Sequence, residues 1–118
     1  MEKNLEISLL FDFYGQMLTD TQQQAVSLYF NDDLSLKETA DILGMSRQGV
    51  RDALSRAQKS LYSYEENLGL YTRFSKTQEG LESIIENARK LCEMVDADTK
   101  DLSNEILYTA LRLYEQEV

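Results

Sequence analysis

Proline is absent from all 118 residues of this chain, and there are only five glycines. Proline interrupts helix interiors and is common in the turns between β-strands, so its absence disfavours a sheet protein and leaves helices unbroken. Apolar residues recur three and four positions apart along most of the chain, which is the spacing of one helix face. We therefore predict an all-α protein.

The composition excludes several classes of protein. Cys92 is the single cysteine and histidine is absent, so neither an intramolecular disulfide nor a zinc site of the usual ligands is expected, and we expect no cofactor or metal. The first residues lack the basic patch and apolar run of a signal peptide, and charges interrupt every apolar stretch well short of the ~20 residues that span a membrane. We expect a cytoplasmic protein.

The spacing of apolar residues divides the chain into three parts. An amphipathic helix is predicted over 1–17, a helical core over 18–62, and a helical extension of two helices over 63–118. Thr19 or Asp20 is expected to cap the first helix of the core, Gly69 to break or kink the start of the extension, and Ser103 or Asn104 to begin the last helix, after a polar turn.

The middle of the chain has the pattern of a helix-turn-helix. Ser35 and Glu38 are spaced as a capping box at the start of a short helix. Ala40 provides the small side chain needed where two helices touch, and Gly44 suits a left-handed turn. Ser46 then caps a second helix, which in DNA-binding versions of this motif enters the major groove.

The second helix carries the only basic part of an acidic chain. The formal net charge is −9, yet residues 45–61 hold 4 basic residues and 1 acidic residue. At about 100° per residue, an apolar stripe including Val50 and Leu54 faces inward, and polar residues form the opposite side. Arginine and glutamine can donate to base edges and phosphates. The predicted nucleic-acid contacts, here named the recognition face, are Ser46, Arg47, Gln48, Arg51, Asp52, Ser55 and Lys59.

Residues 18–61 resemble region 4 of bacterial sigma factors, through "LTDTQQQAVSLYF" and "SLKETADILGMSRQGVRDALSRAQKSL". The resemblance implies a three-helical DNA-binding core of the winged-helix-like superfamily, with Arg47, Gln48 and Arg51 at the positions that contact the upstream promoter element. Gln48 stands where that family commonly has Glu, and Asp52 where a neutral Gln is usual. A carboxylate on the recognition face repels phosphate, so we expect a different sequence preference and weaker binding.

A longer stretch is similar to the YlxM family of Gram-positive bacteria, through "FDFY", "YFNDDLSLKETA", "SRQGVRDALSRAQKSL" and "YEENLGLY". Members of that family are described as helix-turn-helix proteins whose genes neighbour those of the signal recognition particle and its receptor. The resemblance implies a DNA-binding protein that regulates this protein-targeting pathway, with DNA and signal recognition particle components as expected partners.

Two apolar stripes exceed what a three-helix core requires and predict a homodimer, which would double the basic helix. The N-terminal stripe consists of Leu5, Leu9 and Phe13. The C-terminal seam has heptad-like spacing between Phe74 and Val95, with Leu81, Ile85, Ala88 and Cys92 as its proposed contacts. Alternatively, the two stripes pack on each other within one chain.

These patterns favour one class of function, leave a second class open and disfavour a third. A DNA-binding regulator is the first, and an adaptor that binds protein or RNA on a helix-turn-helix scaffold is the alternative. The 12 acidic residues of 62–118 form either a solvated face or a surface for a basic partner. An enzyme is not expected, because the chain has no histidine, no Gly-rich phosphate loop and no calcium-loop pattern.

Overall fold

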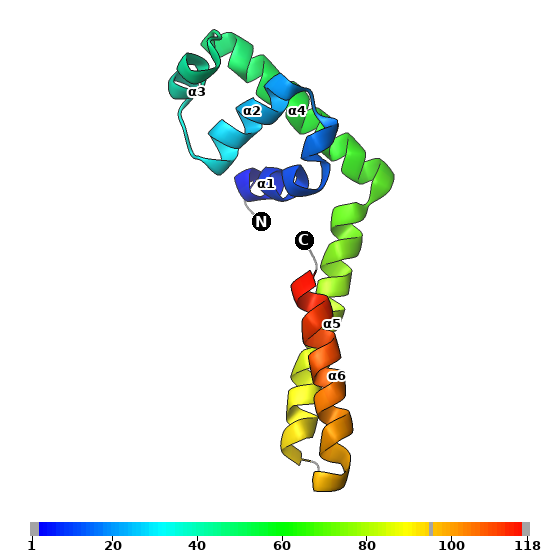
Figure 1. Cartoon of the computed structure of the whole chain (residues 1–118). Coiled ribbons are helices and arrows are strands. Elements are labelled where there is room, and N and C mark those ends of the chain that lie inside the picture. Colours follow the sequence, from blue (N-terminus) through cyan, green and yellow to red (C-terminus); the bar gives the residue numbers. More distant parts are fainter. Residues whose placement is uncertain (1–2, 95, 117–118) are drawn as a thin grey trace. The chain divides into compact units, whose positions relative to one another are not determined.

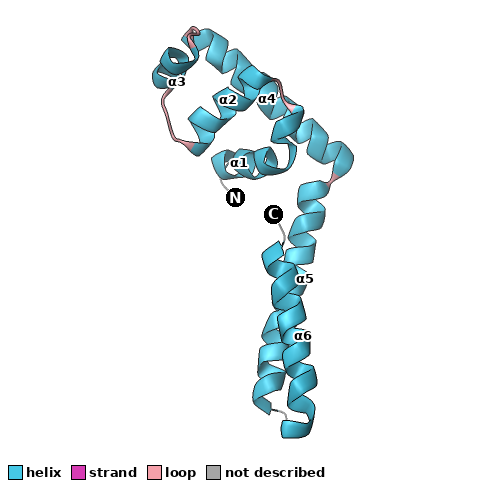
Figure 2. Ribbon diagram, in the orientation of Figure 1, coloured by secondary structure: helices cyan, strands magenta, loops and turns pink. Residues whose placement is uncertain are grey.

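The computed structural model describes residues 3–94 and 96–116, and within these ranges it contains helices and no strand (Figures 1 and 2). The predicted all-α class is confirmed. A 3-10 helix follows the first α-helix (Gly15–Met17), and a π-helical turn follows the second (Ser27–Asn31). The α-helices are α1 (Lys3–Tyr14), α2 (Asp20–Val26), α3 (Leu36–Leu43), α4 (Arg47–Leu68), α5 (Leu70–Met94) and α6 (Ala97–Gln116).

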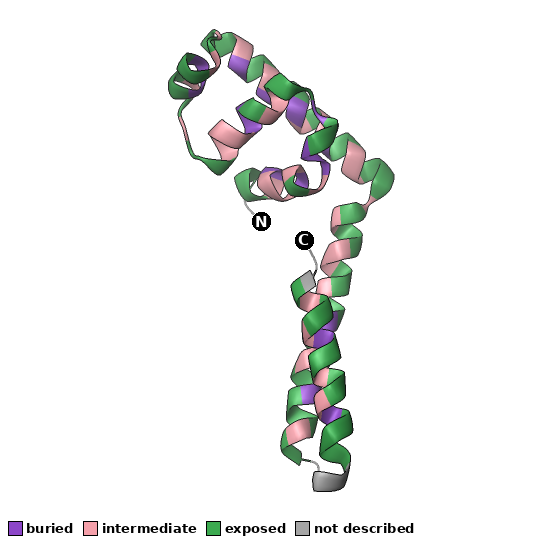
Figure 3. Cartoon of the chain, viewed as in Figure 1, coloured by how far each residue is buried: buried purple, intermediate pink, exposed green. Residues whose placement is uncertain are grey.

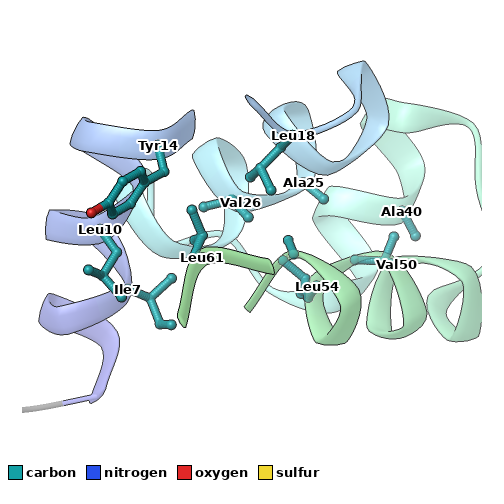
Figure 4. Close-up of a cluster of buried hydrophobic side chains, with 11 residues drawn as sticks. Ile7, Leu10, Tyr14, Leu18, Ala25, Val26, Ala40, Val50, Leu54 and Leu61 are labelled. Carbon is teal, nitrogen blue, oxygen red and sulfur yellow. The ribbon is translucent and has the colours of Figure 1, made fainter. Parts of the chain in front are cut away.

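The chain forms two compact units, residues 1–71 and 72–118. In the first unit, α4 is the central helix, and α1, α2 and α3 all pack on it. Leu61 of α4 lies near Ile7 of α1 and Val26 of α2, and Val50 lies beside Ala40 of α3 (Figure 4). The buried core of this unit consists of Ile7, Leu10, Tyr14, Leu18, Ala25, Val26, Ala40, Val50, Leu54, Ala57 and Leu61.

The buried face of α1 is separate from the N-terminal stripe of Leu5, Leu9 and Phe13, which the sequence predicts as a dimer contact. Leu5 is 52 % exposed, and Leu9 and Phe13 are half-buried. The apolar residues of α1 cover so much of its circumference that periodicity alone does not select the inner side, and packing on α4 selects it. The buried residues of α1 are Ile7, Leu10 and Tyr14.

Local signals set the helix ends as predicted. Thr19, rather than Asp20, caps α2 in a capping box with Gln22. In the second capping box, the Ser35 hydroxyl accepts from the Glu38 amide at 3.0 Å and the Glu38 carboxylate accepts from the Ser35 amide at 3.0 Å. Gly44 ends α3 in the left-handed region at φ 66°.

The first unit extends beyond residue 62, where the sequence placed the end of the helical core. α4 continues without a break to Leu68, and Gly69 ends it with φ 64°. The chain turns at that glycine, and the first residues of α5, Leu70 and Tyr71, donate their amides to side chains of this unit. The unit therefore ends at Tyr71, because these hydrogen bonds tie the start of α5 to it.

The second unit is an antiparallel pair of helices, α5 and α6 (Figure 1). The Tyr114 hydroxyl donates to the Glu82 carboxylate at 2.9 Å, and the Cys92 thiol donates to the Asn104 side-chain carbonyl at 3.4 Å. Among the side chains that the structure describes, few are fully buried between the two helices, and most of these are small. They are Leu81, Ala88, Ser103 and Ala110.

The predicted start of the last helix at Ser103 or Asn104 is wrong. α6 begins at Ala97, because the Asp96 carboxylate accepts from the amide of Thr99 at 3.3 Å and caps the helix there. Ser103 instead lies inside the helix, where its hydroxyl donates to the Thr99 carbonyl at 3.3 Å. In the described part of the chain, no helix has the length and apolar content to cross a bilayer.

Candidate nucleic-acid interface

The helix-turn-helix consists of α3, a tight turn and the first half of α4. Met45 donates its amide to the Ala40 carbonyl at 3.0 Å, which closes the turn after Gly44. The hydroxyl of Ser46 accepts from the Gly49 amide at 2.9 Å and begins α4. Ala40 and Val50 are both buried where the two helices meet (Figure 4), so the small side chain at residue 40 permits their close approach.

The recognition face lies on the solvent side of α4. All seven of its residues are exposed, whereas Val50, Leu54 and Ala57 on the opposite side are buried. Figure 3 shows this division of α4 between exposed and buried positions. The face is available to a ligand along the first four turns of the helix. Its residues are Ser46, Arg47, Gln48, Arg51, Asp52, Ser55 and Lys59.

Two residues of the recognition face are bonded to each other. The Gln48 side-chain amide donates to the Asp52 carboxylate at 3.0 Å, across one helical turn. This hydrogen bond occupies one of the two amide protons that Gln48 can offer to a base, and it holds the carboxylate of Asp52 over the same turn as Arg51. Base contact by Gln48 therefore competes with a contact already present in the free protein.

The basic side chains of α4 are exposed. Within residues 3–94 and 96–116, no carboxylate forms an ion pair with Arg47, Arg51, Arg56 or Lys59. An arginine that already has a carboxylate partner must give it up to bind phosphate, and these side chains have no such partner to lose. Their charge is directed at solvent.

A hollow of about 620 Å³ lies beside the recognition face and brings α3 into the candidate interface. Arg47 and Arg51 line one part of it, and the first turn of α3 lines another, with Lys37 and Glu38. The hydrogen bond from the Ser35 amide lowers the pKa of the Glu38 carboxyl, so this carboxylate is ionised and engaged in the helix cap.

Sequence reasoning did not include Lys37 among the candidate contacts. Lys37 lies in the first turn of α3, exposed, on the same hollow as Arg47 and Arg51. The sequence signal that could have identified Lys37 is its position, two residues after the cap Ser35. A helix-turn-helix brings the start of its first helix toward the phosphate backbone. The positive end of the helix dipole adds to its charge.

The side chains of the C-terminal seam pack within the second unit itself. Leu81 and Ala88 are buried between α5 and α6, and Ile85 and Cys92 are half-buried, with the Cys92 thiol bonded to Asn104. The buried side chains of Leu81 and Ala88 and the thiol of Cys92 are therefore engaged within the same chain. Val95, the last residue of that seam, lies outside the described residues.

In the described ranges, no cluster of three or more His, Cys, Asp or Glu side chains is arranged to hold a metal ion. The acidic residues of α5 and α6 whose side chains the structure describes lie on exposed helix surfaces, as Glu86 does in its ion pair with Lys90 at 3.4 Å. The arrangement on α4 and α3 presents exposed cations to which an anion can bind.

A family profile described as "Putative helix-turn-helix protein, YlxM / p13 like" matches residues 1–104. A UPF0122 protein of Clostridium perfringens is 39% identical over 107 residues, which cover 91% of this chain and 95% of the relative. A UPF0122 protein of Desulforamulus reducens is 44% identical over 72% of this chain and 73% of its own length. One from Caldanaerobacter subterraneus is 48% identical over 70% of each chain.

Proposed function

Because this chain belongs to the UPF0122 family of YlxM-like helix-turn-helix proteins, we propose that it is a DNA-binding regulatory protein and not an enzyme. In this proposal the first turns of α4 enter the major groove of duplex DNA, and the start of α3 lies against a phosphate. The single observation that carries the proposal is the recognition face, whose cations are exposed and have no carboxylate partner among the described residues, in a chain of net charge −9.

The side chains at the start of α4 have the chemistry to read bases. Arg47 and Arg51 lie one turn apart, and an arginine can donate two hydrogen bonds to the O6 and N7 atoms of guanine. Gln48 can read adenine through its N6 and N7 atoms once its amide is released from Asp52. These three residues give sequence preference in our proposal.

A second group of cations binds phosphate. Lys59 lies three turns further along α4, and Lys37 lies at the start of α3, so each reaches the backbone on a different side of the bases read. Few cations contact DNA in one copy of the protein, which limits the affinity that charge neutralisation can supply at physiological salt. Binding by one copy is therefore expected to be weak.

The regulatory target in our proposal is the signal recognition particle pathway, on the strength of the resemblance to the YlxM family. The alternative is an adaptor that binds protein or RNA through the same scaffold. The Gln48–Asp52 hydrogen bond is the observation that favours the alternative, because it holds a carboxylate on the recognition face, where a negative charge repels phosphate.

In vitro selection from a random duplex library, followed by titration of the enriched sequence at several salt concentrations, tests the proposal. We expect an enriched motif rich in guanine and an affinity that falls steeply with salt, with a slope of about −0.9 for each phosphate neutralised. Arg89→Ala, at an exposed arginine of α5, is the control that leaves the motif and the affinity unchanged. Absence of any enriched motif would favour the adaptor.

A further inference from the structure

The second unit has an apolar face that its own two helices do not cover. Its side chains are between 44% and 64% exposed, although all are leucine or isoleucine. Several of them line a hollow of about 370 Å³, where Ile84 of α5 meets the outer side of α6. We call this set the exposed aliphatic face: Ile84, Leu91, Leu102, Ile106 and Leu113.

The positions of these residues follow the heptad of a four-helix bundle. On α5, buried Leu81 and Ala88 alternate with exposed Ile84 and Leu91, with steps of three, four and three residues. Such steps place all four on the one seam that faces the axis of a bundle. Two of the four are covered by α6, and the other two are exposed.

The same alternation occurs on α6. Buried Ser103 and Ala110 alternate with exposed Ile106 and Leu113, again with steps of three, four and three. Both helices thus present an isoleucine and, seven residues later, a leucine on the uncovered half of their seams. Two like helices with like seams form a surface that is complementary to a copy of itself.

The size of the exposed aliphatic face supports a second copy of this chain as the partner that covers it. Inside one chain the pair of helices buries chiefly small side chains, and two helices without a further layer make a poor core. The five exposed residues present on the order of 400 Å² of aliphatic surface per copy, which matches the size of functional patches on monomers. It is also about the apolar half of the roughly 800 Å² that each partner buries in a stable complex.

The borders of this face carry charges of both signs. On the side of α5 away from α6 these are Lys76 and Lys90, and Lys90 is paired with Glu86 at 3.4 Å. The corresponding border of α6 carries Asp101, Glu105 and Arg112. A two-fold axis parallel to the helices brings α5 of one copy beside α6 of the other, with Lys90 level with Glu105, because Cys92 is bonded to Asn104.

We propose that two copies of this chain pair through the exposed aliphatic face of residues 72–118 and form an antiparallel four-helix bundle. The interface is not the C-terminal seam of Leu81, Ile85, Ala88 and Cys92, which packs inside each chain, but the stripe beside it. This proposal does not depend on DNA binding. If DNA is bound, the dimer doubles the number of cations that contact it.

Sedimentation equilibrium over a range of protein concentrations tests the proposal with two matched substitutions on α6. Ile106 lies on the exposed aliphatic face, and Tyr108, two residues on and 66% exposed, lies off it. We expect the wild-type chain and Tyr108→Glu to sediment as dimers, and Ile106→Glu as a monomer. Because Ile106 is half exposed in one chain, the monomer should keep its helical circular dichroism.

A second pair of variants keeps the test decisive if Ile106→Glu fails to fold. Ile84→Ala removes aliphatic surface from α5 without adding charge, and we expect the dimer to dissociate about tenfold more readily. Ser83→Ala, at the exposed neighbouring position, should leave the dissociation constant unchanged. A wild-type monomer at every concentration would overturn the proposal, and so would equal dimerisation of Ile106→Glu and Tyr108→Glu.

Discussion

The phenolic oxygen of Tyr14 lies 2.6 Å from a carboxylate oxygen of Glu65, although 51 residues separate them in the chain. Tyr14 donates this hydrogen bond and accepts another from the Leu70 amide at 2.9 Å. Glu65 also accepts from the Tyr71 amide at 3.0 Å. The pair therefore joins α1 to α4 and supplies acceptors for the first amides of α5, which follow the turn at Gly69.

Tyr14→Phe should reduce the free energy of unfolding by about 1.5–3 kcal/mol, because it removes a hydrogen bond to a charged group and leaves the Leu70 amide without its acceptor. Urea denaturation followed by circular dichroism measures the change. Tyr108→Phe, which removes a hydroxyl from an exposed ring, is the control and should be neutral. Equal stability of Tyr14→Phe and wild type would show that the Tyr14–Glu65 bond does not hold α1.

The ionisation of Tyr14 predicts that the stability of the protein depends on pH. Burial, and next the hydrogen bond to Glu65, raise the pKa of Tyr14 above its usual value of 10.0. Since the folded pKa is raised, its contribution to stability is complete below the unfolded pKa and is lost as pH rises through the folded pKa. Stability should therefore fall above pH 10, and Tyr14→Phe should show a smaller fall over that range.

Gly44→Ala should destabilise the protein by about 1–2 kcal/mol through backbone strain alone, because residue 44 adopts φ 66° and an added Cβ meets no atom within 4 Å. Gly80→Ala is the opposite case. Gly80 lies within helix α5 with equally open surroundings, and alanine there should stabilise by roughly 0.5–1 kcal/mol. Thermal unfolding compares the two, and a change of the same sign in both variants would contradict this account of the turn.

In DNA binding, Arg47→Ala and Arg51→Ala should each cost about 1–3 kcal/mol on the selected sequence and relax its preference at one base position. Lys59→Ala should weaken selected and random duplexes alike, since our proposal assigns Lys59 to phosphate. Fluorescence anisotropy with both duplexes separates these effects. Equal losses for all three variants on both duplexes would leave only a nonspecific basic patch.

Asp52→Asn should raise affinity for any duplex at low salt by about 1 kcal/mol, roughly fivefold, by removing a negative charge near phosphate. Asparagine keeps an oxygen that can still accept from Gln48, so the hydrogen bond across the turn is preserved. Asp12→Asn, at an exposed position of α1, is the matched control. If the Asp52→Asn variant binds DNA with unchanged affinity, the recognition face does not approach DNA.

Sequence patterns predicted the parts of the fold that local interactions determine. The capping box of Ser35, the turn at Gly44 and the cap Ser46 involve atoms at most five residues apart, so each has a recognisable spacing. The side of α1 that faces inward depends instead on packing against α4, which no local spacing reveals. The start of α6 depends on the cap by Asp96, and the sequence does not distinguish this residue from the other acidic residues near it.

The candidate site was partly predictable for the same reason. Helical periodicity separates the recognition face from Val50 and Leu54 because the inward stripe of α4 is narrow and regular. It also permits the Gln48–Asp52 hydrogen bond, a contact between residues four apart. Lys37 belongs to a different helix, and its place on the hollow with Arg47 emerges only from the tertiary fold.

The most direct test of the central claim, that α4 and the start of α3 bind duplex DNA, is an NMR titration of the labelled full chain with the selected duplex. We predict that amide resonances of residues 35–38 and 46–59 shift. The Arg51→Ala substitution should abolish the shifts of the residues in the turn of α4 that contains position 51. Resonances of α5 and α6 should keep their positions. Shifts confined to residues 72–116, or none at all with saturating duplex, would contradict the claim.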